Sequence, residues 1–421
     1  MLVFKFGGAS IQNAKAVRNV KRILDNYHNE RLITVVSAMG KTTNALEAIT
    51  NALYSSNHEK YKSLIDERIA FHLEIMDELF SDKKHPVFGE IQALFNDLLN
   101  RFHLPIAENY DFEYDQIVSI GEIVSSKIIH AFLSLERKDT FWADARTLIR
   151  TNNNYRSAEV KWDKTEKLIH SLTDSHSNKK VIVSQGFIGH TDEGFTTTLG
   201  REGSDFTAGI FAYCLNAKSV TIWKDVPGML NADPKWFENT VKLDKISFKE
   251  AIELAYYGSS VIHPKTIKPL QNKSIPLYVK SFLNPTEEGT VIQHSTDNDD
   301  KVPSFIFKMG QVLLSITPKD FSFIVEENMS YIFKELAKVG AKINIMQNSA
   351  LSFSVCLDVS ETQLNQLISA LSDEFIIKYN NGLELITIRH YNQSTIDRLT
   401  KGKTMLMEQK TRQTVRIVMQ R

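Results

Sequence analysis

Residues 2–36 read LVFKFGGASIQNAKAVRNVKRILDNYHNERLITVV, and this stretch decides the fold class. Leu2–Phe6 is a short apolar run that ends at a Gly-Gly pair, as a buried strand does when it enters a glycine turn. Apolar residues then recur at helical spacing over residues 17–24, and Leu32–Val36 is a second buried strand. A strand, a helix and a strand in so short a stretch predict a parallel α/β sheet.

Strand and helix patterns return further along the chain. Residues 46–104 are mostly helical in pattern and charged, without a strong strand signal. Strand-like and helical runs then alternate, with strands at Val181–Ser184, Val220–Trp223 and Ile275–Val279 and helices at Phe206–Leu215 and Phe248–Tyr257. These segments fit the same α/β class.

The composition changes at His294–Lys301, a polar segment before Pro303 that is the best linker in the chain. After it a βαββα unit is predicted from Val312–Ile316, Met329–Val339, Ile343–Met346, Phe353–Leu357 and Gln363–Leu371. This unit has no dense set of catalytic residue types, so we interpret it as a small binding or regulatory domain. Two further strands, 383–389 and 414–419, are too few to form a domain alone and are expected to pair with it.

Composition excludes several classes of protein. The length of 421 residues suggests two or three domains, and Lys+Arg and Asp+Glu balance at 50 each, so we expect neither nucleic acid nor a membrane as partner. We see no signal peptide and no membrane-length apolar run. Cys214 and Cys356 are far apart, and the 12 histidines lack metal-ligand spacing. We therefore expect no side-chain metal site and a cytoplasmic location.

Two glycine-containing loops follow the first two strands. In Lys5-Phe-Gly-Gly-Ala-Ser10, backbone N–H groups could approach a phosphate closely, and Lys5 could reach a phosphoryl group that is being transferred. A tight turn with a surface lysine is the alternative. The second loop, Val35–Thr43, ends like a P-loop in Gly-Lys-Thr, but Val35 occupies the position of the first glycine. A substrate loop that offers the Ser37 and Thr43 hydroxyls is the preferred interpretation, with a polar turn as the alternative.

Three later segments combine polar groups with turns. Glu122, at the start of a helical pattern, could cap that helix or accept a hydrogen bond from a substrate ammonium. Gly194–Asp205 brings threonines, glycines, an arginine and an aspartate to a helix start, where Ser204 or Asp205 could also be the N-cap. Trp223–Lys235 contains two turn signals, and its charged residues could line a nucleotide pocket or simply solvate a hairpin.

Taken in order, these segments resemble the aspartokinases of the amino-acid kinase family. KFGGAS is similar to the family's opening KFGGTS, and its other signatures are resembled by VVSAMGKTTN (35–44), SIGE (119–122), FWADARTLIRT (141–151), TTTLGREGSD (196–205), IWKDVPGMLNADP (222–234) and YGSSVIHPKT (257–266). The matches keep the family's order from residue 1 to about 292. The tail resembles the ACT domains that follow the kinase region in aspartokinases.

The resemblance implies a fold and a domain arrangement. Residues 1–295 would form the amino-acid kinase domain, a three-layer α/β sandwich with a mainly parallel central sheet. Residues 304–421 would form an α+β ACT-like regulatory region. Its first unit would span about 311–372, and a reduced second unit would come from about 304–310 and 380–421. Because edge strands of such units pair between chains, a homodimer is expected.

The resemblance also implies an activity, phosphorylation of the aspartate side-chain carboxylate by ATP with Mg²⁺, a step towards lysine, threonine and methionine. Lys5 and Asp205 would be catalytic, Asp205 by orienting Lys5. Aspartate would be held by Ser37, Thr43, Glu122, Arg201 and Ser204, with Glu122 on the ammonium and Arg201 on the α-carboxylate. The nucleotide would be bound by Lys5, Gly7, Gly8, Ser10, Lys224, Asp225, Leu230, Lys235 and Ser260.

Some positions depart from the family pattern. Ala9 replaces a threonine, Glu202 replaces a glycine, and Ser260 stands where many relatives have a lysine. In lysine-sensitive relatives acidic residues help to hold the effector, and the matching positions are Asn344 and Ala350, so an amino-acid effector is only a candidate partner. The alternatives are another amino-acid or acyl kinase of this fold and a non-catalytic amino-acid sensor. The ACT-like tail weighs against the first, and the retained Lys5, Glu122, Arg201 and Asp205 against the second.

Overall fold

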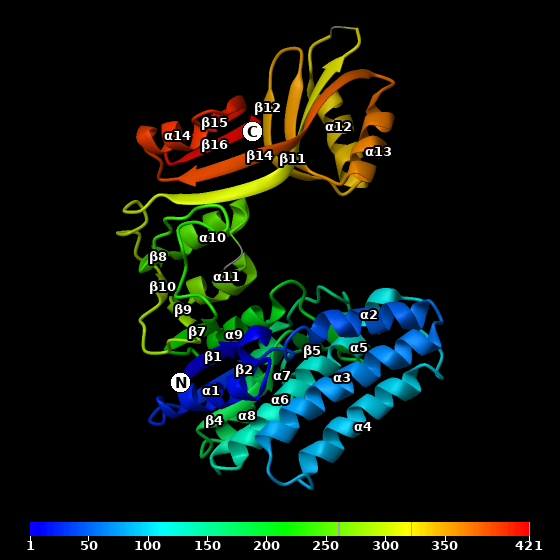
Figure 1. Cartoon of the computed structure of the whole chain (residues 1–421), viewed down its shortest axis with the longest axis vertical. Helices are drawn as coiled ribbons and strands as arrows, with labels where there is room; N and C mark the ends of the chain where they lie inside the picture. Colours follow the sequence, from blue (N-terminus) through cyan, green and yellow to red (C-terminus); the bar gives the residue numbers. More distant parts are fainter. Residues whose placement is uncertain (260–261, 321, 421) are drawn as a thin grey trace. The chain divides into compact units, whose positions relative to one another are not determined.

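The computed structural model describes residues 1–259, 262–320 and 322–420 and divides into two compact units (Figure 1). The first unit comprises Met1–Met229, Lys242–Ile252 and Ser260–Thr296. The second comprises Leu230–Val241, Glu253–Ser259 and Asp297–Arg421. Each unit is built around its own sheet.

The sheet of the first unit has eight strands, and all neighbours are parallel except β9 and β10. Its order is β3 (Thr140–Ala143), β4 (Val181–Gln185), β2 (Leu32–Val36), β1 (Leu2–Phe6), β7 (Ser219–Lys224), β9 (Leu277–Ser281), β10 (Thr290–Gln293) and β8 (Lys245–Ser247). The predicted α/β class with a mainly parallel sheet is therefore confirmed. The strand predicted at Ile275–Val279 begins two residues later, after Pro276.

The first strand divides its side chains between two layers. Successive residues of a strand point to opposite faces of the sheet. Phe4 and Phe6 accordingly enter a large core with α1 (Ala14–Asp25), whereas Val3 and Lys5 point to the other face. On that face α9 (Gly203–Cys214) packs against β1, β2 and β7. The strand register therefore aims Lys5 towards the helix that carries Asp205.

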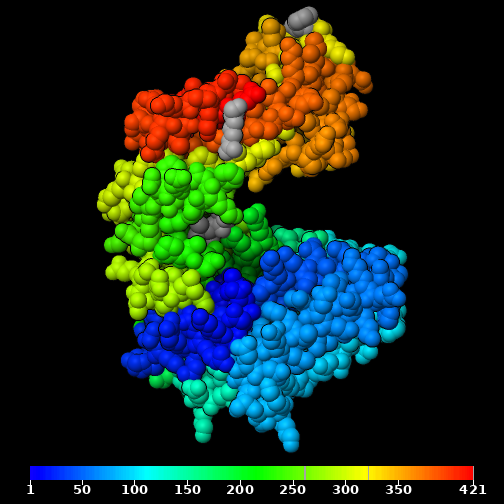
Figure 2. Space-filling model, in the orientation of Figure 1, coloured from blue at the N-terminus to red at the C-terminus, as the bar shows by residue number. Residues whose placement is uncertain are grey.

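The helical segment predicted at residues 46–104 is confirmed and contains α2 (Thr42–Tyr54), α3 (His58–Leu79) and α4 (Pro86–Arg101). Helices α5 (Tyr110–Val118) and α6 (Ile120–Ser134) follow, and together these helices supply much of the large core. Helices α3 and α4 lie at the surface of this unit (Figure 2). The remaining elements are η1 (Gly8–Ile11), α7 (Ala145–Leu148), α8 (Trp162–Ser175), α11 (Pro264–Asn272), and the hairpin β5 (Ile188–His190) and β6 (Thr196–Thr198). Helix α10 (Phe248–Tyr257) belongs to this unit up to Ile252 and to the second unit from Glu253.

Helices α5 and α6 together form the one apolar stretch, among the described residues, that could cross a membrane by length and composition. This stretch, Tyr110–Ser134, has 72% of its apolar window buried inside the protein. Burial of that kind is what the core helix of a globular protein shows, so the stretch is weak evidence for a membrane span.

The second unit is built on a six-stranded antiparallel sheet. Its order is β12 (Lys342–Asn348), β13 (Phe353–Asp358), β11 (Ser304–Pro318), β14 (Phe375–Arg389), β16 (Thr414–Gln420) and β15 (Thr404–Lys410), with α12 (Glu326–Lys338), α13 (Glu361–Leu371) and α14 (Gln393–Thr400). The strands expected at 383–389 and 414–419 do pair with the preceding unit, as predicted.

One long strand of this unit was not predicted as continuous. Residues 305–308 and 312–316, which were predicted to belong to two ACT-like units, both lie in the 15-residue strand β11, and their division between two units stays a prediction. Register shifts between Lys308 and Leu313, beside a left-handed Gly310 with φ of 68°, break the alternation that would reveal a continuous strand. Strand β15 and helix α14 were not predicted, because both are short and rich in polar residues.

Candidate active site

The carboxyl ends of four adjacent parallel strands define the position of the site. Phe6 of β1 is in register with Val36 of β2 and Trp223 of β7, and Val36 is in register with Gln185 of β4. The loops that follow these strands therefore meet at one edge of the sheet. In open parallel sheets this edge is where ligands bind.

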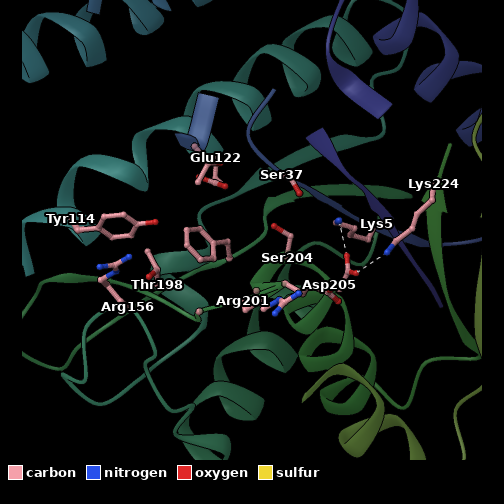
Figure 3. A pocket seen from close by; sticks show the side chains of 15 residues that line it. Lys5, Ser37, Tyr114, Glu122, Arg156, Thr198, Arg201, Ser204, Asp205 and Lys224 are labelled. Carbon is pink, nitrogen blue, oxygen red and sulfur yellow. Dashed lines mark ion pairs between the residues drawn. The ribbon is translucent and has the colours of Figure 1, made fainter. Parts of the chain in front are cut away.

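A cavity of about 440 Å³ lies at this edge (Figure 3). Eight of the predicted residues line it, namely Lys5, Ser37, Thr43, Glu122, Arg201, Ser204, Asp205 and Lys224. They come from segments that are far apart in the sequence. The structure thus brings together the predicted substrate-binding set and both predicted catalytic residues.

Two lysines converge on one buried carboxylate at one end of the cavity. Lys5 Nζ lies 2.6 Å from Asp205 Oδ1, and Lys224 Nζ lies 3.8 Å from Asp205 Oδ2. Lys5 is 8% exposed and Asp205 2%, so water screens this pair weakly. The arrangement holds the Lys5 ammonium in a fixed place, as the predicted orienting role of Asp205 requires.

Close backbone approaches fix the start of α9. The helix begins at Gly203, three residues before the predicted start, and its N-cap is Glu202, so the N-cap interpretation of Ser204 or Asp205 is wrong. A Cβ on Gly186 would lie 2.5 Å from Ser204 Cβ, and only glycine permits that contact. Glu202 has a left-handed φ of 53°, and its buried Oε2 has no hydrogen-bond partner among the described residues.

Glu122 is a buried carboxylate with one unused oxygen. It lies in the first turn of α6 and is 2% exposed. Its Oε1 accepts a hydrogen bond of 3.3 Å from the Ala38 N–H, while Oε2 has no partner among the residues that the structure describes. Burial raises the pKa of Glu122 to about 8. The contact with Ala38, in the loop after β2, shows that Glu122 does more than cap its own helix.

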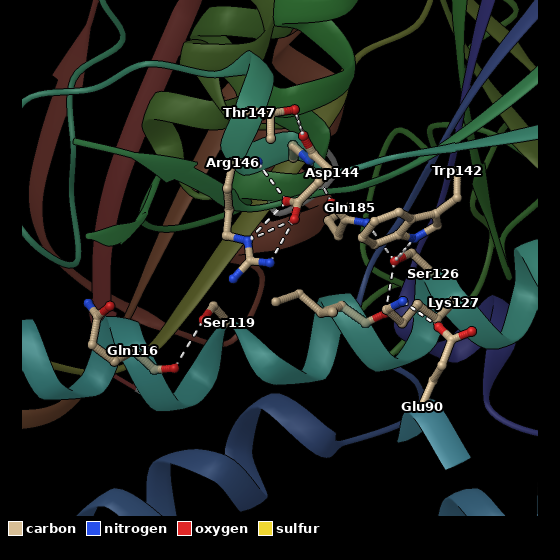
Figure 4. Close-up of polar contacts among 12 residues, drawn as sticks. Glu90, Gln116, Ser119, Ser126, Lys127, Trp142, Asp144, Arg146, Thr147 and Gln185 are labelled. Carbon is tan, nitrogen blue, oxygen red and sulfur yellow. Dashed lines mark hydrogen bonds and ion pairs between the residues drawn. The ribbon is translucent and has the colours of Figure 1, made fainter. Parts of the chain in front are cut away.

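Helix α6, which carries Glu122, is fastened to the sheet by the Ser126 hydroxyl. Trp142 Nε1 of β3 and Gln185 Nε2 of β4 donate to Ser126 Oγ at 3.0 and 2.6 Å (Figure 4). Ser125 Oγ donates to the Ser37 carbonyl at 2.6 Å. These bonds set the distance between Glu122 and the loop that contains Ser37.

The predicted phosphate loop packs tightly against the second loop. A Cβ on Gly8 would lie 2.7 Å from the Ala38 carbonyl oxygen and 2.8 Å from that of Gly40. The Gly40 N–H donates to the Gly8 carbonyl at 3.1 Å. The Ser10 hydroxyl is buried and donates to the Trp223 carbonyl at 3.3 Å, so its predicted contact with phosphate stays a prediction.

The remaining predicted nucleotide residues are not gathered in this cavity. Asp225 is exposed directly after β7. Leu230 and Lys235 belong to the second compact unit, and Ser260 lies outside the described residues. Their roles stay predictions.

Three residues that line the cavity, Tyr114, Arg156 and Phe187, were not predicted from the sequence, and Thr198 was named only as one of the threonines of Gly194–Asp205. Asp115 was not predicted either; it accepts hydrogen bonds from Thr198 N–H at 2.8 Å, Thr198 Oγ1 at 2.7 Å and Arg156 N–H at 3.0 Å. Burial raises the pKa of Asp115 to about 6. Asp115 lies in the helical segment YDFEYDQIV. Its pattern does not mark Asp115 as functional, because the hydrogen-bond partners of this residue are distant in sequence.

The chain belongs to the amino acid kinase family, whose sequence profile matches residues 1–281. Within that family it is similar to lysine-sensitive aspartokinase 3 of Escherichia coli (strain K12), with 29% identity over 401 residues that cover 92% of this chain and 86% of the relative. The resemblance to aspartokinases seen in the sequence is thereby confirmed.

Two solved structures extend the similarity to three dimensions. E. coli aspartokinase III in complex with lysine and aspartate (T-state) has a TM-score of 0.83 and 26% identity, covering 99% of this chain and 95% of that one. The same enzyme in complex with aspartate and ADP (R-state) has a TM-score of 0.78 and 25% identity, covering 100% and 96%. The similarity therefore includes both the kinase fold and the C-terminal sheet.

Proposed function

We propose that this protein is an aspartate kinase, which transfers the γ-phosphoryl group of ATP to the side-chain carboxylate of L-aspartate. The observation that carries the proposal is the cavity at the strand ends. At one end it presents two lysines around Asp205, and it also presents an unpaired carboxylate oxygen of Glu122. The lysines can neutralise a phosphoryl group, and the Glu122 oxygen can accept a hydrogen bond from the ammonium of an amino acid. The aspartate and ADP complex of the E. coli relative supports the same pairing of ligands.

Aspartate would be held by groups around the cavity. The substrate ammonium would donate to Glu122 Oε2, the α-carboxylate would meet the Arg201 guanidinium, and hydroxyls would come from Ser37, Thr43 and Ser204. This orientation directs the side-chain carboxylate towards Lys5 and Asp205. Glu122 Oε2, which is buried without a hydrogen-bond partner among the described residues, would then accept a charge-assisted hydrogen bond.

The reaction requires no general base. The side-chain carboxylate of aspartate is ionised at neutral pH, so its oxygen can attack the γ-phosphorus directly. The new bond joins this oxygen to phosphorus, and the bond from phosphorus to the β,γ-bridging oxygen breaks and releases ADP. Lys5 Nζ, held by Asp205, neutralises charge on the transferred phosphoryl oxygens. Catalysis is then positioning plus electrostatic stabilisation.

We propose that ATP binds through Lys5, Gly7, Gly8 and Ser10 and through Lys224, Asp225, Leu230, Lys235 and Ser260. Mg²⁺ would accompany the nucleotide and neutralise its phosphates. Because the Asp205 carboxylate is already paired with two lysines, phosphate oxygens and water are the ligands expected for this ion. The glycines let the loop approach the phosphates closely.

We propose that residues 1–295 form the kinase region and that residues 304–421 form the regulatory region. We also propose a cytoplasmic location. Lysine inhibition is not expected to follow the pattern of the lysine-sensitive relative. Asn344 Oδ1 accepts from Lys308 Nζ at 2.7 Å, and its Nδ2 donates to Gln311 Oε1 at 2.6 Å. Both ends of this side chain are therefore used within the second unit.

A homodimer is proposed through the second unit. Strand β12 is an edge of its sheet, and Met346 on it is 49% exposed. An edge strand presents backbone N–H and C=O groups that can pair with a further strand, which a second copy of the chain can supply. Sedimentation equilibrium tests this, with a monomer as the contradicting result.

The test of the proposed function is ADP formation with a panel of acceptors. Aspartate alone should support turnover, whereas glutamate and N-acetylglutamate should not. Turnover with one of the other acceptors would favour another acyl kinase of this fold. Binding of amino acids without ADP release would favour a sensor.

A further inference from the structure

Arg156 lies in the substrate cavity although no sequence motif marks it. Its backbone has a left-handed φ of 63°, which a non-glycine residue adopts only when its surroundings enforce it. Those surroundings are visible. The Arg156 N–H donates to buried Asp115 Oδ2 at 3.0 Å, and the same carboxylate binds Thr198 on the hairpin that leads to Arg201.

The loops that carry the two arginines of the cavity touch each other. A Cβ on Gly200 would lie 3.1 Å from the Arg156 carbonyl oxygen, and the Ala158 N–H donates to the Thr198 carbonyl at 3.0 Å. Arg156 and Arg201 are therefore presented to the same cavity by loops of fixed relative position.

The Arg156 guanidinium stacks on an aromatic ring and has only long contacts with carboxylates. Its carbon lies 4.3 Å from the centre of the Tyr114 ring. Asp111 Oδ1 and Glu47 Oε1 are each 3.4 Å from a guanidinium nitrogen. These two hydrogen bonds, from Nη1 and Nη2, are longer than the 2.7–2.9 Å of strong charge-assisted ones, so a substrate carboxylate can compete for the planar fork.

The cavity has two chemically different ends. Figure 3 shows Lys5, Asp205 and Lys224 at one end and Tyr114, Arg156 and Thr198 at the other. In the proposed function Lys5 and Lys224 contact the nucleotide and its transferred phosphoryl group. Arg156 and Arg201 are then the other described cations of this cavity that can meet a carboxylate that does not react. Resting on the proposed function, we infer that Arg156 is a further substrate-binding residue, whose guanidinium pairs with the α-carboxylate of aspartate alongside Arg201.

The inference is tested by steady-state kinetics of Arg156→Gly with aspartate and with aspartate α-amide, which lacks that carboxylate. Glycine adopts φ of 63° without strain, so this variant removes the guanidinium and keeps the loop. We expect the KM for aspartate to rise ~10- to 100-fold, with kcat and the KM for ATP little changed. Preference for aspartate over the α-amide should fall by a similar factor. Arg156→Lys, which keeps the charge but not the fork, should restore part of the affinity.

Glu47→Gln is the matched control, because it breaks one ion pair of Arg156 and leaves the guanidinium in place. Its KM for aspartate should be unchanged or lower. If Arg156 served only in a surface ion-pair network, Arg156→Gly and Glu47→Gln would behave alike, with a normal KM and normal discrimination against the α-amide. That result would overturn the inference alone. Lack of aspartate-dependent turnover in the unaltered protein would overturn the proposed function, and the inference with it.

Discussion

The Lys5 ammonium nitrogen lies 2.6 Å from Asp205 Oδ1, and this contact joins the first strand of the chain to the helix that begins at Gly203. Both side chains are buried, and both line the cavity at the strand ends. The pair places one fixed positive charge where a transferred phosphoryl group would lie. Its removal should therefore affect the chemical step more than substrate binding.

Lys5→Ala should reduce kcat by at least ~100-fold, because a preorganised donor to the transferred group is lost. Lys224 remains near Asp205, so the fold should persist with normal circular dichroism. The measurement is kcat by coupled ADP release, with the exposed Lys15→Ala as control. A near-normal kcat in Lys5→Ala would rule out the assignment of Lys5.

Aspartate binding should strengthen as pH rises towards 8. Burial raises the pKa of Glu122 to about 8, so below that pH the carboxyl must release a proton before it can accept from the substrate ammonium. The calorimetric Kd for aspartate should fall between pH 6 and about 8, with release of protons to the buffer. In Glu122→Gln the binding should be weaker and its dependence on pH much flatter. An equally steep profile in that variant would show that another group titrates.

The Glu122 carboxyl should also make the unfolding free energy of the ligand-free protein depend on pH. The pKa of Glu122 in the folded state, about 8, exceeds the ordinary value of 4.5. The contribution of this shift to the unfolding free energy is therefore fully present below pH 4.5 and is lost as pH rises to about 8. Glu122→Gln stays neutral and should lose less unfolding free energy over this interval. Urea denaturation at pH 5 and pH 8 measures the difference, and parallel losses in both proteins would contradict it.

Gly8→Ala should impair both folding and activity. The added methyl group would lie 2.7 and 2.8 Å from two backbone carbonyl oxygens, which cannot move as a side chain can. We expect a loss of about 1–3 kcal/mol in unfolding free energy and a higher KM for ATP. Gly89→Ala is the matched control, because a Cβ there meets nothing within 4 Å. Equal behaviour of the two variants would show that the loop can yield.

Titration of the protein with lysine should give no binding heat in the micromolar range. The Asn344 side chain is already bound to Lys308 and Gln311 and carries no charge for a second ammonium. Threonine and methionine, titrated in parallel, show whether the second unit answers another end product. Saturable heat with lysine, together with inhibition of turnover, would contradict this expectation.

The sequence predicted the features that depend on local pattern. The short apolar run Leu2–Phe6 predicted the first strand, and the glycines after it marked a close approach that the structure shows at Gly8. Features that depend on tertiary contacts were not predicted. Arg156 and Asp115 meet because the loop that contains Arg156 packs against helix α5, which is distant in sequence, and no periodicity encodes a left-handed arginine. The continuous strand β11 was missed because a bulge interrupts its alternation.

The central claim is transfer of a phosphoryl group from ATP to the side-chain carboxylate of aspartate. The most direct measurement is incubation of the protein with ATP, Mg²⁺ and aspartate in the presence of hydroxylamine, which traps an acyl phosphate as a hydroxamate. We predict that aspartyl β-hydroxamate forms in step with ADP, and that both require aspartate. ADP release without hydroxamate, or neither product in the presence of aspartate, would contradict the account.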